Sequence, residues 1–236
     1  MPREMHMIVP SGMVLASFLA FSASIQAQIA FQNLDFEQAN LGADPQPGYV
    51  SVASALPYWT VSLGGGPQTE MIYNEQSLGA TCVSLVAAAH EGTDLVYGPI
   101  DGNYSVLLQG GISLSSASIS QKGWIPWNAQ SLLFKAEPGD IPLEVEISGQ
   151  DIPYTAVGSG TEVGSARTYT LFAADVSAWA GETETLTFSA LEGEDNNWLL
   201  DDISFSPNAV PEPNTLSLLV MGVLALAARR WRRNGS

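Results

Sequence analysis

Two tryptophans close together in the chain are the first residues that suggest a chemistry. Trp124 and Trp127 belong to a Gly-Trp-Ile-Pro-Trp-Asn stretch over 123–128, which has the composition of a loop between two strands. An aromatic ring can cover the apolar face of a sugar, while nearby amide and carboxylate groups bind its hydroxyls. Trp124 and Trp127 are therefore the candidate ligand-binding residues. Ordinary packing in a hydrophobic core is the alternative for each of them.

Features that would indicate catalysis are sparse. His90 is the only histidine after the N-terminal segment, and no cysteine or second histidine near it completes a zinc site. The Gly-x-Ser-x-Gly turn of many serine hydrolases is absent from the sequence. Paired carboxylates could hydrolyse a glycosidic bond, but the 22 acidic residues between the chain ends offer so many pairs that none stands out. We assign no catalytic residue and expect a protein that is not an enzyme, with a glycan-active hydrolase as the alternative.

Charge is distributed unevenly along the chain. The 236 residues carry a net charge of −16, yet five of the eight basic residues lie near the ends, namely Arg3, Arg229, Arg230, Arg232 and Arg233. Once Glu4 and Glu212 are also set aside, the middle keeps three basic and 22 acidic residues, a net charge of −19. Such a surface repels nucleic acid and attracts divalent cations. The single cysteine, Cys82, excludes an intrachain disulfide and is expected to be a small buried residue.

The C-terminus combines three elements in a fixed order. Pro211, Glu212 and Pro213 come first, and prolines end the preceding domain because they lack an N–H and fix φ. An apolar segment over 215–228 follows, and it is predicted to be a helix. The arginines at 229, 230, 232 and 233 come last and favour the cytoplasmic side of a membrane. This string resembles the PEP-CTERM sorting motif of Gram-negative bacterial surface proteins.

That resemblance implies an exosortase-like sorting enzyme as a partner and an association with exopolysaccharide and biofilm matrix. The Pro-Glu-Pro triplet would be the recognition element, and the apolar helix would hold the precursor in the inner membrane as a single span. An ordinary C-terminal anchor is the alternative. The uncharged run from Leu216 to Ala228 has only 13 residues, or about 20 Å as a helix against about 30 Å of hydrocarbon, which favours the sorting interpretation.

The N-terminus is typical of a secretory signal peptide, which implies the Sec export machinery as a second partner. Arg3 precedes an apolar stretch from Met7 to Phe21, and small residues cluster before Ala27, where we expect cleavage. The expected organisation is a signal peptide at 1–27, one β-sandwich domain at 28–208 and the sorting signal at 209–236.

The middle of the chain alternates apolar and polar residues with the period of β-strands. In 142–148, Leu143, Val145 and Ile147 point one way, as in a half-buried strand. Further strands are expected at 31–37, 58–63, 82–87, 104–109, 112–119, 131–134, 169–173, 183–189 and 199–205. One helical turn is expected between Asp175, which begins it, and Gly181, which ends it. The pattern predicts an all-β, antiparallel sandwich or jelly roll.

Several segments resemble galactose-binding-like jelly rolls, the class that includes many carbohydrate-binding modules. They are 175–181, 184–188 and 198–203, together with the Asn-Leu-Asp-Phe-Glu stretch at 33–37, which resembles the first strand of that fold. The resemblance implies that the first and last strands pair and that a structural calcium ion lies near their junction. Glu37 and Asp201 are the matching positions for its ligands.

The alternation of side chains along the last strand predicts that Asp201 faces the core. If Ile203 and Phe205 face the core, Asp201 faces the same way, and an inward carboxylate needs a partner. No lysine or arginine lies near it in the sequence. Calcium, which prefers six to eight oxygen ligands, would be such a partner. The alternatives are that both acids are solvated at strand ends, or that Asp201 accepts backbone N–H bonds.

Together these features predict an exported, non-catalytic surface or extracellular-matrix protein. Its precursor would be anchored in the inner membrane and then sorted to the cell surface or matrix, where its domain could bind polysaccharide. A structural or adhesive biofilm protein without a small ligand is the alternative, and a carbohydrate-active enzyme is a further one. No nucleic-acid partner is expected.

Overall fold

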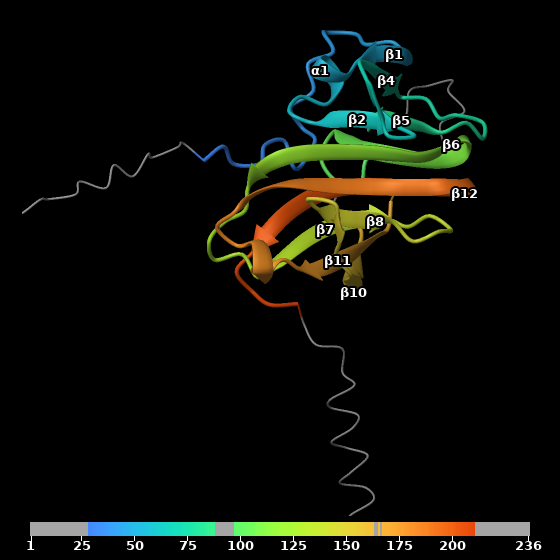
Figure 1. Ribbon diagram of the computed structural model, residues 1–236. Coiled ribbons are helices and arrows are strands. Elements are labelled where there is room, and N and C mark those ends of the chain that lie inside the picture. Colours follow the sequence, from blue (N-terminus) through green and yellow to red (C-terminus); the bar gives the residue numbers. More distant parts are fainter. Residues whose placement is uncertain (1–27, 88–96, 163–164, 166, 211–236) are drawn as a thin grey trace, which may run out of the picture.

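Two long strands, β6 (Tyr104–Trp124) and β12 (Thr183–Ser206), run side by side through the domain (Figure 1). This computed structural model describes residues 28–87, 97–162, 165 and 167–210. The strands pair antiparallel from Thr183 opposite Trp124 to Leu200 opposite Val106. Irregularities on either side of Gly193 interrupt the register, as bulges do where a strand bends. Each long strand is thereby divided into two halves.

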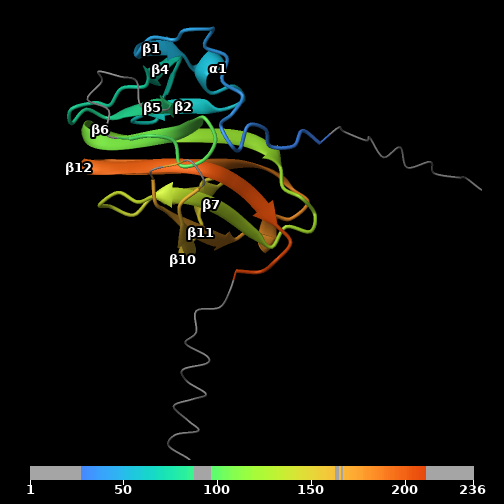
Figure 2. The ribbon, with the colours of Figure 1, turned by 180° about the vertical axis from the view of Figure 1, so that it is seen from behind.

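The halves belong to different layers of a β-sandwich, seen from two sides in Figures 1 and 2. In the first layer, residues 104–109 of β6 pair with β5, and residues 199–206 of β12 pair with β7. The layer continues through β4 to β1 on one side and through β11 to β10 on the other. Its remaining strands are β1 (Gly48–Ser51), β4 (Glu70–Tyr73), β5 (Cys82–Ala87), β7 (Ser131–Glu137), β10 (Tyr154–Gly160) and β11 (Tyr169–Asp175).

In the second layer, residues 116–124 of β6 pair with residues 183–191 of β12. Strand β2 (Thr60–Leu63) adds to β6, and β8 (Glu144–Ile147) adds to β12. The short strands β3 (Gly66–Gln68) and β9 (Gln150–Asp151) lie at the two edges. The pairs between the described strands are antiparallel except for β4 and β5, which are parallel.

Side chains from both layers fill the space between them. Phe134 of β7 in the first layer contacts Phe188 of β12 in the second, with ring centroids 5.3 Å apart. Val106, Leu108 and Leu200 belong to the same cluster of buried residues. A smaller cluster of Val86, Ile100, Leu107 and Leu199 lies apart from it. Because Leu107 and Leu199 alternate with residues of the main core, this cluster marks the outer face of the first layer, covered by the loop that contains Ile100.

The structure confirms the predicted all-β sandwich and several local features. Val145 and Ile147 are buried while Glu144 and Glu146 are partly exposed, as expected for a half-buried strand. The expected helical turn is the short 3-10 helix η1 (Ser177–Trp179). Asp175 Oδ1 accepts the Ser177 N–H at 2.9 Å, and Gly181 ends the turn at a φ of +86°.

The strand predicted at 31–37 is wrong. Asn33 and Phe36 have φ values of +51° and +59°, which no β-strand permits, and Asn33 Oδ1 accepts the N–H of Gln38 at 2.9 Å. The segment is therefore a tight turn, although Leu34 O still accepts the N–H of Ile203 of the last strand at 2.9 Å. The four-residue helix α1 (Val52–Ala55) was not predicted either.

The predicted signal peptide and the predicted spanning segment at 215–228 lie outside the described residues. Of the helices that the structure does describe, none has the length and apolar character to cross a membrane.

Candidate functional site

An acidic pocket of about 240 Å³ brings together the two residues predicted to bind calcium. Glu37 comes from the N-terminal turn and Asp201 from β12, and the pocket is lined by these two with Asp35, Asp101, Gly102 and Asp202. Asp101 lies in the loop that covers the outer face of the first layer. Glu37 and Asp201 therefore line the same pocket, together with the carboxylates of Asp35, Asp101 and Asp202.

Asp201 is almost completely buried, with 1% of its surface exposed. Its Oδ2 accepts the N–H of Asp101 at 3.0 Å and the hydroxyl of Ser105 at 2.5 Å. Its Oδ1 accepts the N–H of Asp202 at 2.7 Å. Burial raises the pKa of Asp201 to about 7, and the hydrogen bonds to Ser105, Asp101 and Asp202 offset only part of that rise. The buried carboxyl thus holds the covering loop to the last strand.

Asp201 does not face the main core, contrary to the expectation from alternation. Ile203 packs in the main cluster, but Asp201 shares the outer face with Leu199. Between them, Asp202 has a φ of +44°, and the pairing of β12 with β7 shifts register between Asp201 and Ser204. This irregularity reverses which face the following residues occupy.

Lys135 stands opposite Asp201 in the register of β7 and β12, but it pairs with neighbouring carboxylates and not with Asp201 itself. Its Nζ lies 2.8 Å from Asp101 Oδ2, 2.6 Å from Glu162 Oε1 and 3.1 Å from Asp202 Oδ2. Burial alone would lower the pKa of Lys135, but its bonds to these three carboxylates raise it above its usual value. Bonding to Lys135 in turn lowers the pKa of Asp101. Lys135 therefore supplies a fixed positive charge beside the pocket.

Glu37 acts as a clamp on the same loop. Its Oε1 accepts the N–H groups of Asn103 and Tyr104 at 2.7 and 2.9 Å, and its Oε2 accepts the Asn103 side-chain amide at 2.7 Å. Gly102 lies so close that a Cβ atom there would collide with the Glu37 carboxylate. Its φ of +55° also favours glycine. Both predicted calcium ligands thus hold the 101–105 loop in place.

The fit of this pocket to a calcium ion is poor as it stands. The donor type is right, because carboxylate oxygens are what calcium prefers. Nevertheless, both oxygens of Glu37 and both of Asp201 already accept hydrogen bonds, and Lys135 neutralises their neighbours. Among the residues with described positions, no three acidic, histidine or cysteine side chains are arranged to hold one metal ion.

The second candidate site is the aromatic loop at 125–130, between β6 and β7. Trp127 is 76% exposed, which is unusual for so large an aromatic side chain. Trp124, at the end of β6, is half-buried, and its ring N–H donates to Gly181 O at 3.2 Å. Asn128 and Gln130 are exposed beside Trp127. The two predicted ligand-binding tryptophans therefore differ, since only Trp127 presents a free ring.

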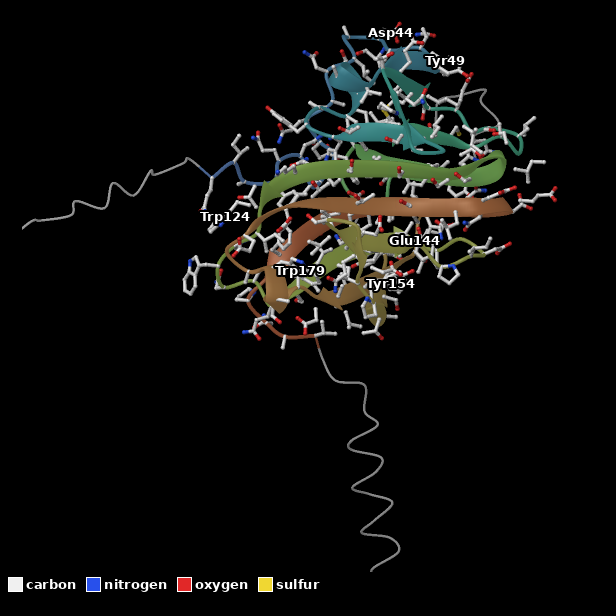
Figure 3. The ribbon with its side chains drawn as sticks, viewed as in Figure 1. Asp44, Tyr49, Trp124, Glu144, Tyr154 and Trp179 are labelled. Carbon is white, nitrogen blue, oxygen red and sulfur yellow. The ribbon has the colours of Figure 1, made fainter. Side chains whose placement is uncertain are left out.

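The other tryptophans of the domain are structural. Trp59 and Trp198 are buried, and their ring N–H groups donate to Asn33 O at 2.9 Å and Ile141 O at 2.8 Å. Trp179 packs against the main core and lies at the same end of the domain as Trp124 (Figure 3). Trp59 and Trp198 are therefore core residues.

Sequence reasoning missed Lys135, Asp101 and Asp202. One signal for Lys135 was present in the sequence, because it directly follows the apolar strand residues Ser131-Leu132-Leu133-Phe134. A lysine that is buried in such a strand requires acidic partners. Asp101 and Asp202 carry no such signal, since they join the pocket only through a loop and a bulge.

The described residues thus form a β-sandwich domain, and the C-terminal tail lies beyond them in the sequence. Residues 209–233 match the PEP-CTERM protein-sorting motif, which confirms the motif expected from the Pro-Glu-Pro triplet and implies processing by an exosortase-type system. A comparison with curated proteins found no match.

Among solved structures, the chain is similar to two cyclases and a carbohydrate-binding module. An apo cyclase from Fischerella sp. is 11% identical with a TM-score of 0.39, and the match covers 78% of this chain and 98% of that one. The Stig cyclase Fisc from Fischerella sp. TAU, in complex with an indole compound, is 12% identical with a TM-score of 0.41. The match covers 75% of this chain and 94% of that one. TmCBM61, in complex with beta-1,4-galactotriose, is 15% identical with a TM-score of 0.35 and coverages of 76% and 99%. Similarity at this level transfers no ligand or activity to this chain.

Asp201 gives the stability of the domain a specific dependence on pH. Its pKa is about 7 in the folded state and about 3.9 in an unfolded chain. Between these values the folded state holds a proton that the unfolded state has lost, so this contribution is complete at low pH and is lost as the pH rises through the folded pKa. Denaturant unfolding between about pH 5 and about pH 6.5 should show it as a loss of up to about 1.4 kcal/mol per pH unit.

The variant D201N isolates this effect, because asparagine does not titrate. Its unfolding free energy should depend less steeply on pH than that of the unmodified protein. D35N removes an exposed carboxylate from the same pocket and controls for the change in net charge. Equal slopes for D201N and the unmodified protein would contradict the assignment.

Proposed function

We propose that this protein is an exported, non-catalytic surface or matrix protein whose domain binds polysaccharide through the aromatic loop. The observation that supports delivery is the sorting motif at 209–233, which begins three residues after β12 ends at Ser206. The observation that supports binding is the exposed ring of Trp127, which is followed in the chain by the exposed amide residues Asn128 and Gln130. A sugar could stack on the ring and hydrogen-bond to Asn128 and Gln130.

In the proposed route, the precursor is exported by the Sec machinery and held in the inner membrane by the tail. The Pro-Glu-Pro triplet is recognised by an exosortase-like enzyme, and the domain is then released to the cell surface or matrix. The four C-terminal arginines keep the end of the chain on the cytoplasmic side. A negatively charged domain that faces outward is compatible with this topology.

Two alternatives make different use of the same domain. A structural or adhesive matrix protein would need no ligand at Trp127. A glycoside hydrolase would need two carboxyl groups that reach a substrate. Asp201 has the raised pKa of a general acid, but its side chain is buried and both its oxygens are bonded within the protein. The acidic pocket therefore favours a structural role over a catalytic one.

Sorting is tested by changing the recognition triplet. In a Gram-negative host that has an exosortase, E212A or a double alanine replacement of Pro211 and Pro213 should leave the protein in the membrane fraction, because the enzyme no longer recognises the tail. Fractionation and immunoblotting measure this. The matched control is N214A, just outside the triplet. Normal processing of the triplet variants would contradict the proposed route.

Glycan binding is tested with the released protein on a glycan array. W127A should weaken binding, because the ring that would cover the apolar face of the sugar is removed; the loss expected for one large apolar side chain is about 1.5–3 kcal/mol. Y49A is the matched control, since Tyr49 is 77% exposed and lies on β1, well away from Trp124 (Figure 3). Binding that persists in W127A would contradict a sugar-binding site at Trp127. No binding by the unmodified protein would favour the structural alternative.

Calcium binding at Glu37 and Asp201 stays a prediction, because it requires the hydrogen bonds at these residues to rearrange. An ion that binds only the folded state raises the Tm by mass action. A thermal-shift titration with calcium after treatment with a chelator measures this, with magnesium as the control cation. An unchanged Tm would contradict a calcium site.

A further inference from the structure

We propose that the end of the domain that bears Trp127 and Ile29 rests on the lipid bilayer while the tail anchors the precursor. This tail-side end consists of residues 29–31, 124–130, 177–182 and 206–210. The inference rests on the membrane anchoring in the proposed function, and it adds a specific orientation of the domain.

The point where the chain leaves the domain is fixed beside the aromatic loop. Gln130 N–H donates to Ser206 O at 2.8 Å, and the Ser131 hydroxyl donates to Asn208 O at 2.8 Å. Gln130 is only three residues from Trp127. The backbone is therefore held to this end of the domain almost up to Pro211, where the sorting triplet begins.

The connection from there to the apolar segment is short. Only residues 211–215 separate Val210 from Leu216, and five extended residues span at most about 18 Å. Two of the five are prolines, which restrict the conformations of the connection. A domain on so short a connection cannot move far from the membrane surface, and the surface nearest its exit point is the tail-side end.

That end carries exposed apolar side chains. Trp127 is 76% exposed and Ile29 is 66% exposed. Ile29 O accepts the N–H of Trp124 at 2.8 Å, and Gly181, whose carbonyl accepts the Trp124 ring N–H, lies next to Trp127. These contacts bring Ile29 and Trp127 to the same region. Tryptophan favours the interface between lipid headgroups and hydrocarbon, so this surface fits a bilayer.

Charge indicates which lipid the surface fits. Asp175, Glu182 and Glu184 lie at or beside this end, and Lys122 is the one described basic residue near it. Such a balance repels anionic headgroups. The proposed contact is therefore with a zwitterionic lipid surface, through apolar side chains.

The test places a fluorescent probe at this end of the full-length chain. In I29C the thiol can be labelled selectively, because Cys82 is 6% exposed and burial raises the pKa of its thiol to about 11. The matched control is L78C. Leu78 is 97% exposed, and its neighbour Gly79 bonds through its carbonyl to Ile112 N–H in the bulged part of β6, remote from Trp124. Each labelled chain is reconstituted into phosphatidylcholine vesicles that contain a lipid with a quencher near the headgroup.

We expect the probe at position 29 to be quenched several-fold more strongly than the probe at position 78. Adding W127S to I29C should reduce the quenching, and so should vesicles rich in phosphatidylglycerol. If the chain does not float with the vesicles, the anchoring itself is contradicted and the orientation falls with it. If it floats but both probes are quenched equally, the orientation alone is overturned, and a contact with the sorting enzyme becomes the better explanation of this surface.

Discussion

The antiparallel pairing of β6 with β12 is the constraint on which the rest of the domain depends. Because the two strands pair on both sides of their bulges, they belong to both layers and fix how the layers lie on each other. The crossing requires close backbone approach. A Cβ atom on Gly110 would collide with the Leu191 carbonyl, and one on Gly111 would collide with the backbone of Ala80 and Thr81. Every other strand in the described part of the chain adds to one of the four halves directly or through a neighbour.

A second constraint is the scarcity of positive charge. The region between the chain ends has three basic residues against 22 acidic ones, so most carboxylates must be exposed or satisfied by N–H and O–H groups. Lys135 serves three carboxylates at once, and Arg167 is paired with Glu137. Asp201 is left to hydrogen bonds alone, and burial therefore raises its pKa. The acidic pocket can be explained as a solution to this shortage without any bound ion.

The sequence was sufficient for features that depend on local pattern. The alternation in 142–148, the Asp175 turn and the Pro-Glu-Pro tail each combine a periodicity or a residue type with a direct physical consequence. Prediction failed where one residue adopts a positive φ. Asn33 and Phe36 turn an expected strand into a loop, and the irregularity at Asp202 puts Ile203 on the opposite face from Asp201. The Lys135 cluster was out of reach because its members come from β7, β12 and two loops, whose proximity only the topology determines.

The position of the aromatic loop connects the two parts of the proposed function. A ring as exposed as that of Trp127 is stabilised whenever an apolar surface covers it. Beside the anchored tail, the nearest apolar surface is the bilayer, and after release it is whatever the matrix offers. The proposed lipid contact and the proposed sugar contact at Trp127 would therefore follow each other in time. Removal of the tail would then both free the domain and expose its binding residue.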